Sequence, residues 1–147
     1  MLIGRLEEIW QYPLKSAAGQ KLEQATVTEA GIVGDRCWAV LDSEQDEIRT
    51  AKRWPELLNL AASLQEQPKV DGAIYGDAVP AVTVTLPSGE SFSSRDEDAN
   101  QRVSDFLGRP ARLEPLEPPS NTAHYKIATA RTEENMVTEM GLLEGEE

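Results

Sequence analysis

Short runs in which every second residue is apolar constrain the fold of this chain more than any other feature. The clearest run lies at residues 81–86, where Val82, Val84 and Leu86 alternate with threonines. Strict alternation is typical of a β-strand that buries one face in a core. Residues 67–79, just before this run, contain Pro, Gly and Asp, which are typical of a loop. The pattern therefore favours short strands joined by tight connections.

Less regular runs predict further strands in the same chain. A turn at Ser88 and Gly89 predicts a hairpin that returns through Phe92. Residues 57–64 fit a helical turn or a strand, and we expect a strand. The remaining strands are expected at residues 2–12, 21–28, 36–42, 47–50 and 111–116.

One segment changes to helical spacing. Asp96 is a suitable N-cap and Gly108 a suitable C-terminal stop, and the apolar residues between them share one helical face: Ala99, Val103, Phe106 and Leu107. The regular alternation of strands and helices that a parallel α/β fold requires is missing. We therefore expect a mainly β fold, either a sandwich or, as we prefer, an antiparallel β-barrel-like domain with one late α-helix.

Composition sets the outer limits of the domain and of its function. We assign residues 1–116 to the β domain and residues 117–147 to an acidic tail or linker, in which a short helix is conceivable at 132–140. The net charge of −12 argues against nucleic acid as a partner, because phosphate binding needs a basic surface. The sequence has no apolar run of membrane-spanning length and no secretory signal, so we expect a cytoplasmic protein without membrane contact.

The sequence contains few residues or motifs that are typical of catalytic sites. Cys37 and His124 are the single cysteine and the single histidine, so a cysteine-rich zinc site and an internal disulfide are excluded. We expect His124 to be solvated and Cys37 to be a packing residue in a buried strand. No Gly-rich nucleotide motif or nucleophile motif occurs. No catalytic residues and no metal ligands are predicted.

Five residues near the N-terminus offer donors for an anion. They comprise two lysines, an arginine and two hydroxyl side chains: Lys15, Ser16, Arg36, Thr50 and Lys52. Ammonium, guanidinium and hydroxyl groups are the donors that phosphate oxygens accept. Since Arg36 opens a predicted strand, its side chain is expected to be held rigidly. The alternative is that these cations merely balance neighbouring acids, such as Asp35 beside Arg36.

Three motifs that contain these residues resemble a known family. The stretches "YPLKSAAG", "GDRCW" and "TAKRWPEL" occur in the order found in the N-terminal β-barrel domain of MOSC proteins, a family related to molybdenum cofactor sulfurase and to amidoxime-reducing components. The resemblance implies that Lys15, Ser16 and Arg36 hold the pterin phosphate of the molybdenum cofactor. It places Thr50 and Lys52 near the pterin, although Lys52 stands where the family pattern has arginine.

The resemblance also bears on activity and partners. In the family a MOSC domain with the metal-ligating cysteine follows this segment, and Cys37 does not match that cysteine. We therefore expect a module that binds or positions molybdenum cofactor (molybdopterin) without independent catalysis. The implied partners are a missing or separate MOSC domain and a redox partner. The alternative is an interaction scaffold that packs on another domain and has no ligand of its own.

Overall fold

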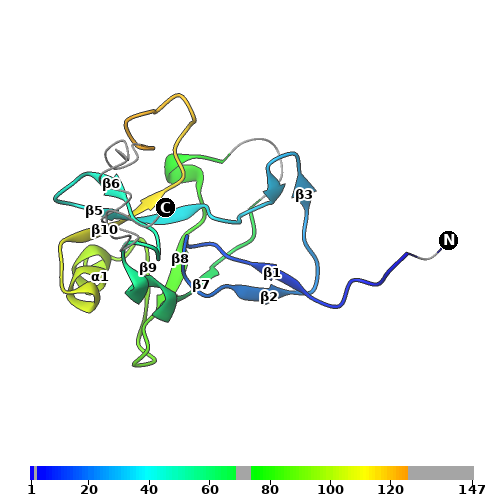
Figure 1. Cartoon of the computed structure of the whole chain (residues 1–147), viewed down its shortest axis with the longest axis horizontal. Helices are drawn as coiled ribbons and strands as arrows, with labels where there is room; N and C mark the ends of the chain where they lie inside the picture. The colour runs from blue at the N-terminus through cyan, green and yellow to red at the C-terminus, as the bar shows by residue number, and fades with distance from the viewer. Residues whose placement is uncertain (2, 69–73, 126–147) are drawn as a thin grey trace, which may run out of the picture.

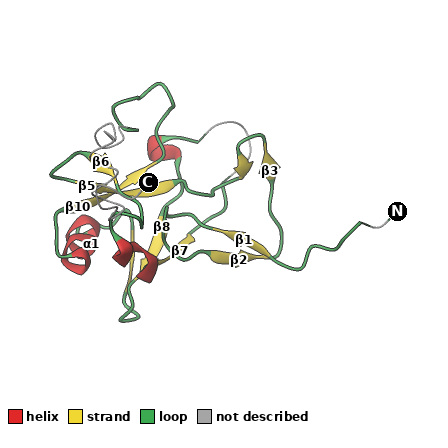
Figure 2. Cartoon of the chain, in the orientation of Figure 1, coloured by secondary structure: helices red, strands yellow, loops and turns green. Residues whose placement is uncertain are grey.

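Two three-stranded antiparallel sheets form the body of the protein (Figures 1 and 2). The structure is a computed structural model that describes residues 1, 3–68 and 74–125. The first sheet has the order β10 (Ala111–Pro115), β5 (Trp38–Asp42), β6 (Glu47–Ile48). The second has the order β7 (Ala61–Leu64), β8 (Val82–Thr85), β9 (Ser91–Ser93).

Smaller elements surround these sheets. Two-stranded sheets are formed by β1 (Ile9–Gln11) with β2 (Gln20–Leu22) and by β3 (Val27–Thr28) with β4 (Gly31–Ile32). The helical elements are the 3₁₀ helices η1 (Pro55–Asn59) and η2 (Gly76–Ala78) and the α-helix α1 (Ala99–Leu107). None of the helices in the described residues is long and apolar enough to cross a bilayer.

Strand β5 is the centre of the first sheet. All five of its residues are buried, and it pairs with β10 over its whole length, from Trp38 opposite Pro115 to Asp42 opposite Ala111. Val40 in its middle is fully buried, as is Val84 in the second sheet, and both belong to one hydrophobic core. A strand buried on both faces is expected to be apolar throughout, and β5 fits that expectation except for Asp42.

The segment between β1 and β2 connects the two large sheets. The Lys15 N–H donates to the Trp38 carbonyl at the start of β5, at 2.9 Å. The Ala18 N–H donates to the Leu60 carbonyl, and the Ala18 carbonyl accepts from the Ala62 N–H, so the segment also pairs with β7. Leu14, directly before Lys15, is fully buried. The stretch "YPLKSAAG" is thus both a loop and a structural link.

Helix α1 confirms the periodicity found in the sequence. Ala99, Val103 and Leu107 are buried, and Gly108 ends the helix in the left-handed conformation with a φ of 66°. The N-cap residue is Asp98, not Asp96 as predicted. The Asp96 carboxylate instead accepts a hydrogen bond from the Ser93 N–H, which stabilises the turn before the helix.

Several predicted strands are shorter than expected or are divided. Among the described residues of the strand predicted at 2–12, the strand itself covers only Ile9–Gln11, and the prediction for residues 21–28 is divided between β2 and β3. Residues 57–64 begin in η1 and continue into β7, while the predicted strand at 36–42 begins only at Trp38.

The architecture is mainly β with antiparallel pairing, as predicted. The preferred barrel is not confirmed, because the strands in the described residues form four separate sheets and no closed barrel. Most of the predicted tail, including the short helix at 132–140, lies outside the described residues, and the boundary at residue 116 stays a prediction.

Candidate functional site

Two of the predicted motifs lie side by side along their backbones. The Arg36 N–H donates to the Tyr12 carbonyl at 2.8 Å, and the Trp38 N–H donates to the Pro13 carbonyl at 2.9 Å. With the bond from the Lys15 N–H to the Trp38 carbonyl, these contacts form a short parallel ladder. The ladder fixes the segment of Lys15 and Ser16 against the segment of Arg36.

The third motif joins through a side chain. The Ala51 N–H donates to Ser16 Oγ at 3.1 Å, which places Ser16 beside the turn that contains Thr50 and Lys52. The Thr50 carbonyl accepts from the N–H groups of Arg53 and Trp54, both at 2.9 Å, and so closes this turn. The structure therefore brings together the backbones of all three predicted motifs.

Ser16 and Arg36 both have left-handed backbone conformations. Their φ angles are 69° and 50°, and the third described residue other than glycine with positive φ is Asp46, in the turn between β5 and β6. Such conformations cost about 1–3 kcal/mol each and concentrate at functional sites. The N–H groups of Lys15, Ala17 and Arg36 are already bound to the carbonyls of Trp38, Leu14 and Tyr12. Among the described residues, the Ser16 N–H has no hydrogen-bond acceptor.

The Arg36 side chain does not match the expectation of a rigid fork. Arg36 precedes β5, and its side chain is 69% exposed. Its Nη1 atom lies 3.3 Å from Asp35 Oδ2, so the predicted pairing with a neighbouring acid is present. Asp35 is itself held, because its Oδ1 atom accepts the Tyr12 N–H at 2.7 Å. The Arg36 guanidinium is thus mostly exposed and paired with an acid that the Tyr12 backbone holds in place.

Lys15 and Lys52 differ from most cations of the described chain. Lys15 is half-buried and Lys52 is exposed, and neither makes an ion pair or a side-chain hydrogen bond with a described residue. By contrast, Lys21 pairs with Glu8, and Arg109 pairs with Glu56. In a chain with 26 acidic and 14 basic residues, lysines without a described acidic partner are unexpected. Their positive charge is available to an anion.

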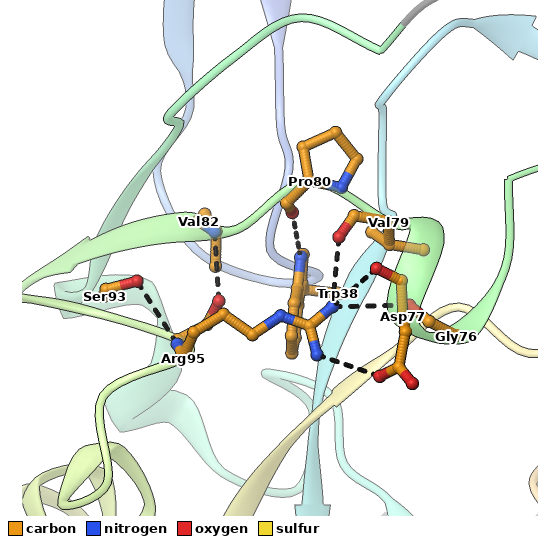
Figure 3. A network of polar contacts seen from close by, with 9 residues as sticks. Trp38, Gly76, Asp77, Val79, Pro80, Val82, Ser93 and Arg95 are labelled. Carbon is orange, nitrogen blue, oxygen red and sulfur yellow. Dashed lines mark hydrogen bonds and ion pairs between the residues drawn. The ribbon is translucent and has the colours of Figure 1, made fainter.

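Arg95 contacts Trp38, whose backbone binds the segment of Lys15, and nothing in the sequence indicated this role. Its guanidinium lies over the Trp38 ring at 5.0 Å and donates to the Val79 carbonyl at 3.1 Å, with longer contacts to Gly76 and Asp77 (Figure 3). The Trp38 indole N–H donates to the Pro80 carbonyl at 2.9 Å. Trp38 is thereby fixed by its side chain, while its backbone binds Pro13 and Lys15.

Arg49 is a second residue that the sequence did not single out. It donates two hydrogen bonds to Asp42 Oδ2, at 2.7 and 3.0 Å, and one to Glu47 Oε2 at 3.0 Å. Its guanidinium lies 5.6 Å from the centre of the Trp54 ring, on which Arg109 also stacks at 4.9 Å. Arg49 and Trp54 flank the turn of Thr50 and Lys52, so they hold both of its ends.

The carboxylate of Asp42 has a lowered pKa. Burial acts to raise the pKa, but hydrogen bonds from Arg49 and from the N–H groups of Glu44 and Gln45 outweigh it. Asp42 is therefore ionised at neutral pH and forms a buried ion pair with Arg49.

Cys37 and His124 do not add a reactive centre. Cys37 is buried, and this burial raises the pKa of its thiol to about 12, so the thiol stays protonated at neutral pH. This agrees with the predicted packing role. His124 is partly buried against the edge of the Tyr125 ring, with centroids 4.8 Å apart, instead of being fully solvated. No cluster of three or more potential metal ligands occurs among the described residues.

The sequence of this chain is similar to those of known proteins. Mitochondrial amidoxime-reducing component 1 of Mus musculus is 29% identical over 120 residues, which covers 71% of this chain and 35% of that protein. Molybdenum cofactor sulfurase of Solanum lycopersicum is 38% identical over 100 residues, which covers 63% of this chain and 11% of that protein. The chain thus spans about a third or less of the curated relatives it matches. The model of the MOSC N-terminal beta barrel domain matches residues 3–110, which include every predicted site residue, and the chain belongs to this family.

Proposed function

We propose that this domain binds the phosphate-bearing part of molybdenum cofactor and has no catalytic activity of its own. The observation that supports the proposal best is the hydrogen-bonded meeting of the three motifs around Ser16. The names of two relatives, molybdenum cofactor sulfurase and an amidoxime-reducing component, point to the same cofactor at the level of the family. The reaction of a whole MOSC protein would then depend on a MOSC domain, in the same chain or separate, and on a redox partner.

The chemistry of the donors fits a phosphate group. Lys15 and Arg36 would supply positive charge, and the Ser16 N–H is a further donor. Ser16 Oγ already accepts the Ala51 N–H, so its hydroxyl hydrogen is available to a phosphate oxygen. Thr50 and Lys52 would contact the adjoining pterin or a second phosphate oxygen. When bound, such a cofactor supplies the chemistry, and these residues supply binding and orientation.

Asp35 sets the affinity of this site in our proposal. Its carboxylate lies 3.3 Å from the Arg36 guanidinium and would repel an incoming anion. A phosphate would have to draw Arg36 away from Asp35, and the 69% exposure of Arg36 leaves it room to move. Removal of the Asp35 charge should therefore strengthen anion binding, whereas removal of Arg36 should weaken it.

Titration calorimetry with pyrophosphate and with a phosphorylated pterin tests the proposal at low ionic strength. Arg36→Ala should weaken binding by about tenfold, because a charge-assisted contact is lost. Lys21→Met is the matched control: it also removes one positive charge, but from an exposed pair with Glu8, and should leave binding within about twofold.

A further variant should have the opposite effect, and it has a matched control. Asp35→Asn should raise the affinity by several-fold, and the asparagine oxygen can still accept the Tyr12 N–H. Asp46→Asn removes the same charge from the pair with Arg112 and should leave the affinity unchanged. Absence of binding to the wild-type chain, or equal effects of the site variants and their controls, would refute the anion site.

A second role, as an interaction scaffold, is favoured by a different observation. Large apolar side chains are exposed near the N-terminus, among them Ile3 at 90% and Leu6 at 74%. Exposed apolar side chains that lie together often mark interaction surfaces. This role does not exclude anion binding, because the exposed residues precede the site in the chain.

A further inference from the structure

The N-terminal arm, residues 3–8, extends away from the body of the protein without a partner strand. Figure 1 shows it leaving the β1–β2 pair toward the N-terminus. Residues 3–7 make no backbone hydrogen bond with the described residues, and the pairing with β2 begins at Ile9 opposite Leu22. A β-like segment with unpaired N–H and C=O groups is a template for another strand.

Apolar residues occur on both sides of this arm. In an extended chain successive side chains point to opposite faces, so Ile3 and Ile9 share one face, while Leu6 and Trp10 share the other. Ile3, Leu6 and Trp10 are 90%, 74% and 44% exposed. Charged residues alternate with these apolar ones, with Arg5 and Glu7 on the face of Ile3 and Glu8 on the face of Leu6. The arm therefore offers both apolar and charged side chains to a partner strand.

The sequence of the arm is complementary to itself when two copies run antiparallel. If Leu6 lies opposite Leu6 of a second copy, Arg5 lies opposite Glu7, and Ile3 lies opposite Ile9. Opposite charges and apolar residues that face each other directly stabilise antiparallel pairs. Within one copy, Arg5 and Glu7 make only a loose contact of 3.7 Å between highly exposed side chains. Both are free to exchange this contact for the one across the pair.

We propose that this arm pairs with the arm of a second copy of the chain, in an antiparallel two-fold arrangement centred on Leu6. Two-fold symmetry repeats the Arg5–Glu7 and Ile3–Ile9 contacts twice, while the Leu6–Leu6 contact lies on the axis and occurs once. Since β1 already pairs with β2, the two copies would form one sheet with β2 at its outer edges. The arms are short, so the buried area falls below the roughly 1,200–2,000 Å² of a stable complex, and the dimer should be weak and reversible.

Sedimentation velocity of the full chain from about 10 µM to about 1 mM covers the range in which a weak dimer forms. The wild-type chain should shift from monomer to dimer. Arg5→Glu and Glu7→Arg should each raise the dissociation constant by about tenfold or more, because each replaces two attractive pairs by two repulsive ones. The double variant R5E/E7R restores both pairs and should return to within about threefold of wild type.

A second pair of variants tests the apolar contact. Leu6→Thr should weaken the dimer, whereas Val27→Thr, an equally exposed change on β3, should not. All five variants should keep the circular dichroism spectrum and melting temperature of the wild type, because the changed side chains are exposed. The proposal is overturned by a monomer at every concentration, by a dimer that ignores the charge reversals, or by a double variant that stays as weak as the single ones. A monomer whose arm amides are protected only in a longer chain would assign the arm to another domain.

Discussion

The thiol of Cys37 lies one residue after Arg36, yet it is shielded from the solvent that reaches Arg36. Its side chain is buried near the Pro13 carbonyl, with 3.8 Å between Sγ and the oxygen. Burial is the main cause of the raised pKa, and the charge of Asp35 adds to it. Thiolate is the reactive form of cysteine, so the environment of Cys37 suppresses its reactivity.

Native Cys37 should therefore react very slowly with a thiol reagent such as iodoacetamide. With a pKa of about 12, its thiolate fraction at pH 8 is on the order of a thousandfold below that of an ordinary cysteine. Mass spectrometry of labelling over time would measure the rate, and the same chain in concentrated urea is the control, since its thiol should react at the ordinary rate. Similar rates in both conditions would contradict the burial of this side chain.

Residue types in the site could be predicted from sequence, but their conformations could not. The motifs with Lys15, Ser16 and Arg36 are visible as donors in an acidic chain. Ser16 and Arg36 have left-handed backbone angles and contacts with residues far away in the sequence. Ser16 accepts the Ala51 N–H, and the Arg36 N–H donates to the Tyr12 carbonyl within the ladder. Arg36 was expected to open the strand, but β5 begins at Trp38, so Arg36 precedes it and its side chain lies mostly in solvent.

At the scale of elements, the turn between β6 and η1 depends on a partly buried ion pair. Arg49 and Asp42 have side-chain exposures of only 12% and 10%. Removing one partner of such a pair leaves the other charge in a poorly solvated place. The turn of Thr50 and Lys52 follows directly, so its position depends on Arg49.

Arg49→Met should lower the free energy of unfolding by about 3 kcal/mol, because Asp42 and Glu47 lose their cation. Urea unfolding at pH 7 measures this loss. Lys21→Met, from an exposed pair, should cost less than about 1 kcal/mol. Equal losses for the two variants would show that the Arg49 pair contributes no more than a surface pair.

The stability gap between wild type and Arg49→Met should depend on pH. In the wild type the pKa of Asp42 is lowered, so the stabilisation is complete above the ordinary value of about 3.9 and is lost as the pH falls through the lowered pKa. In the variant Asp42 no longer faces Arg49, and its carboxylate takes up a proton more readily. The gap should therefore narrow in acid, and a constant gap would point to lost packing instead of lost charge pairing.

Elements with strong local periodicity were predicted well. Helix α1 and strand β8 follow from the spacing of their own apolar residues. The strand predicted for residues 2–12 is paired only at Ile9–Gln11, because strand formation needs a partner and residues 3–7 have none within the described part of the chain. The same dependence on pairing explains why residues 21–28 are divided between β2 and β3.

At the scale of the whole molecule, the two large sheets depend on the segment around Leu14. This side chain is fully buried in the core between backbone contacts to β5 on one side and to β7 on the other. Because the sheets share this link and one core, we expect them to unfold together.

Leu14→Ala should lower the free energy of unfolding by about 2–5 kcal/mol, because it leaves a cavity in the core. Leu58→Ala makes the same chemical change at a site that is 63% exposed and should cost less than about 0.5 kcal/mol. Urea unfolding should be followed by tryptophan fluorescence and by circular dichroism. Separate transitions from the two probes would show that the sheets unfold independently.

The pairing of β5 with β10 also has a consequence for the order of folding. β6 follows β5 closely in the chain, but β10 is separated from it by the second sheet and α1. Closing so long a loop is slow compared with forming a hairpin. During synthesis, β5 and β6 can pair early. The other edge of β5 has no strand to pair with until Ala111–Pro115 have left the ribosome. Helix α1 directly precedes β10, so docking of α1 on the core would bring β10 next to β5 and complete the first sheet.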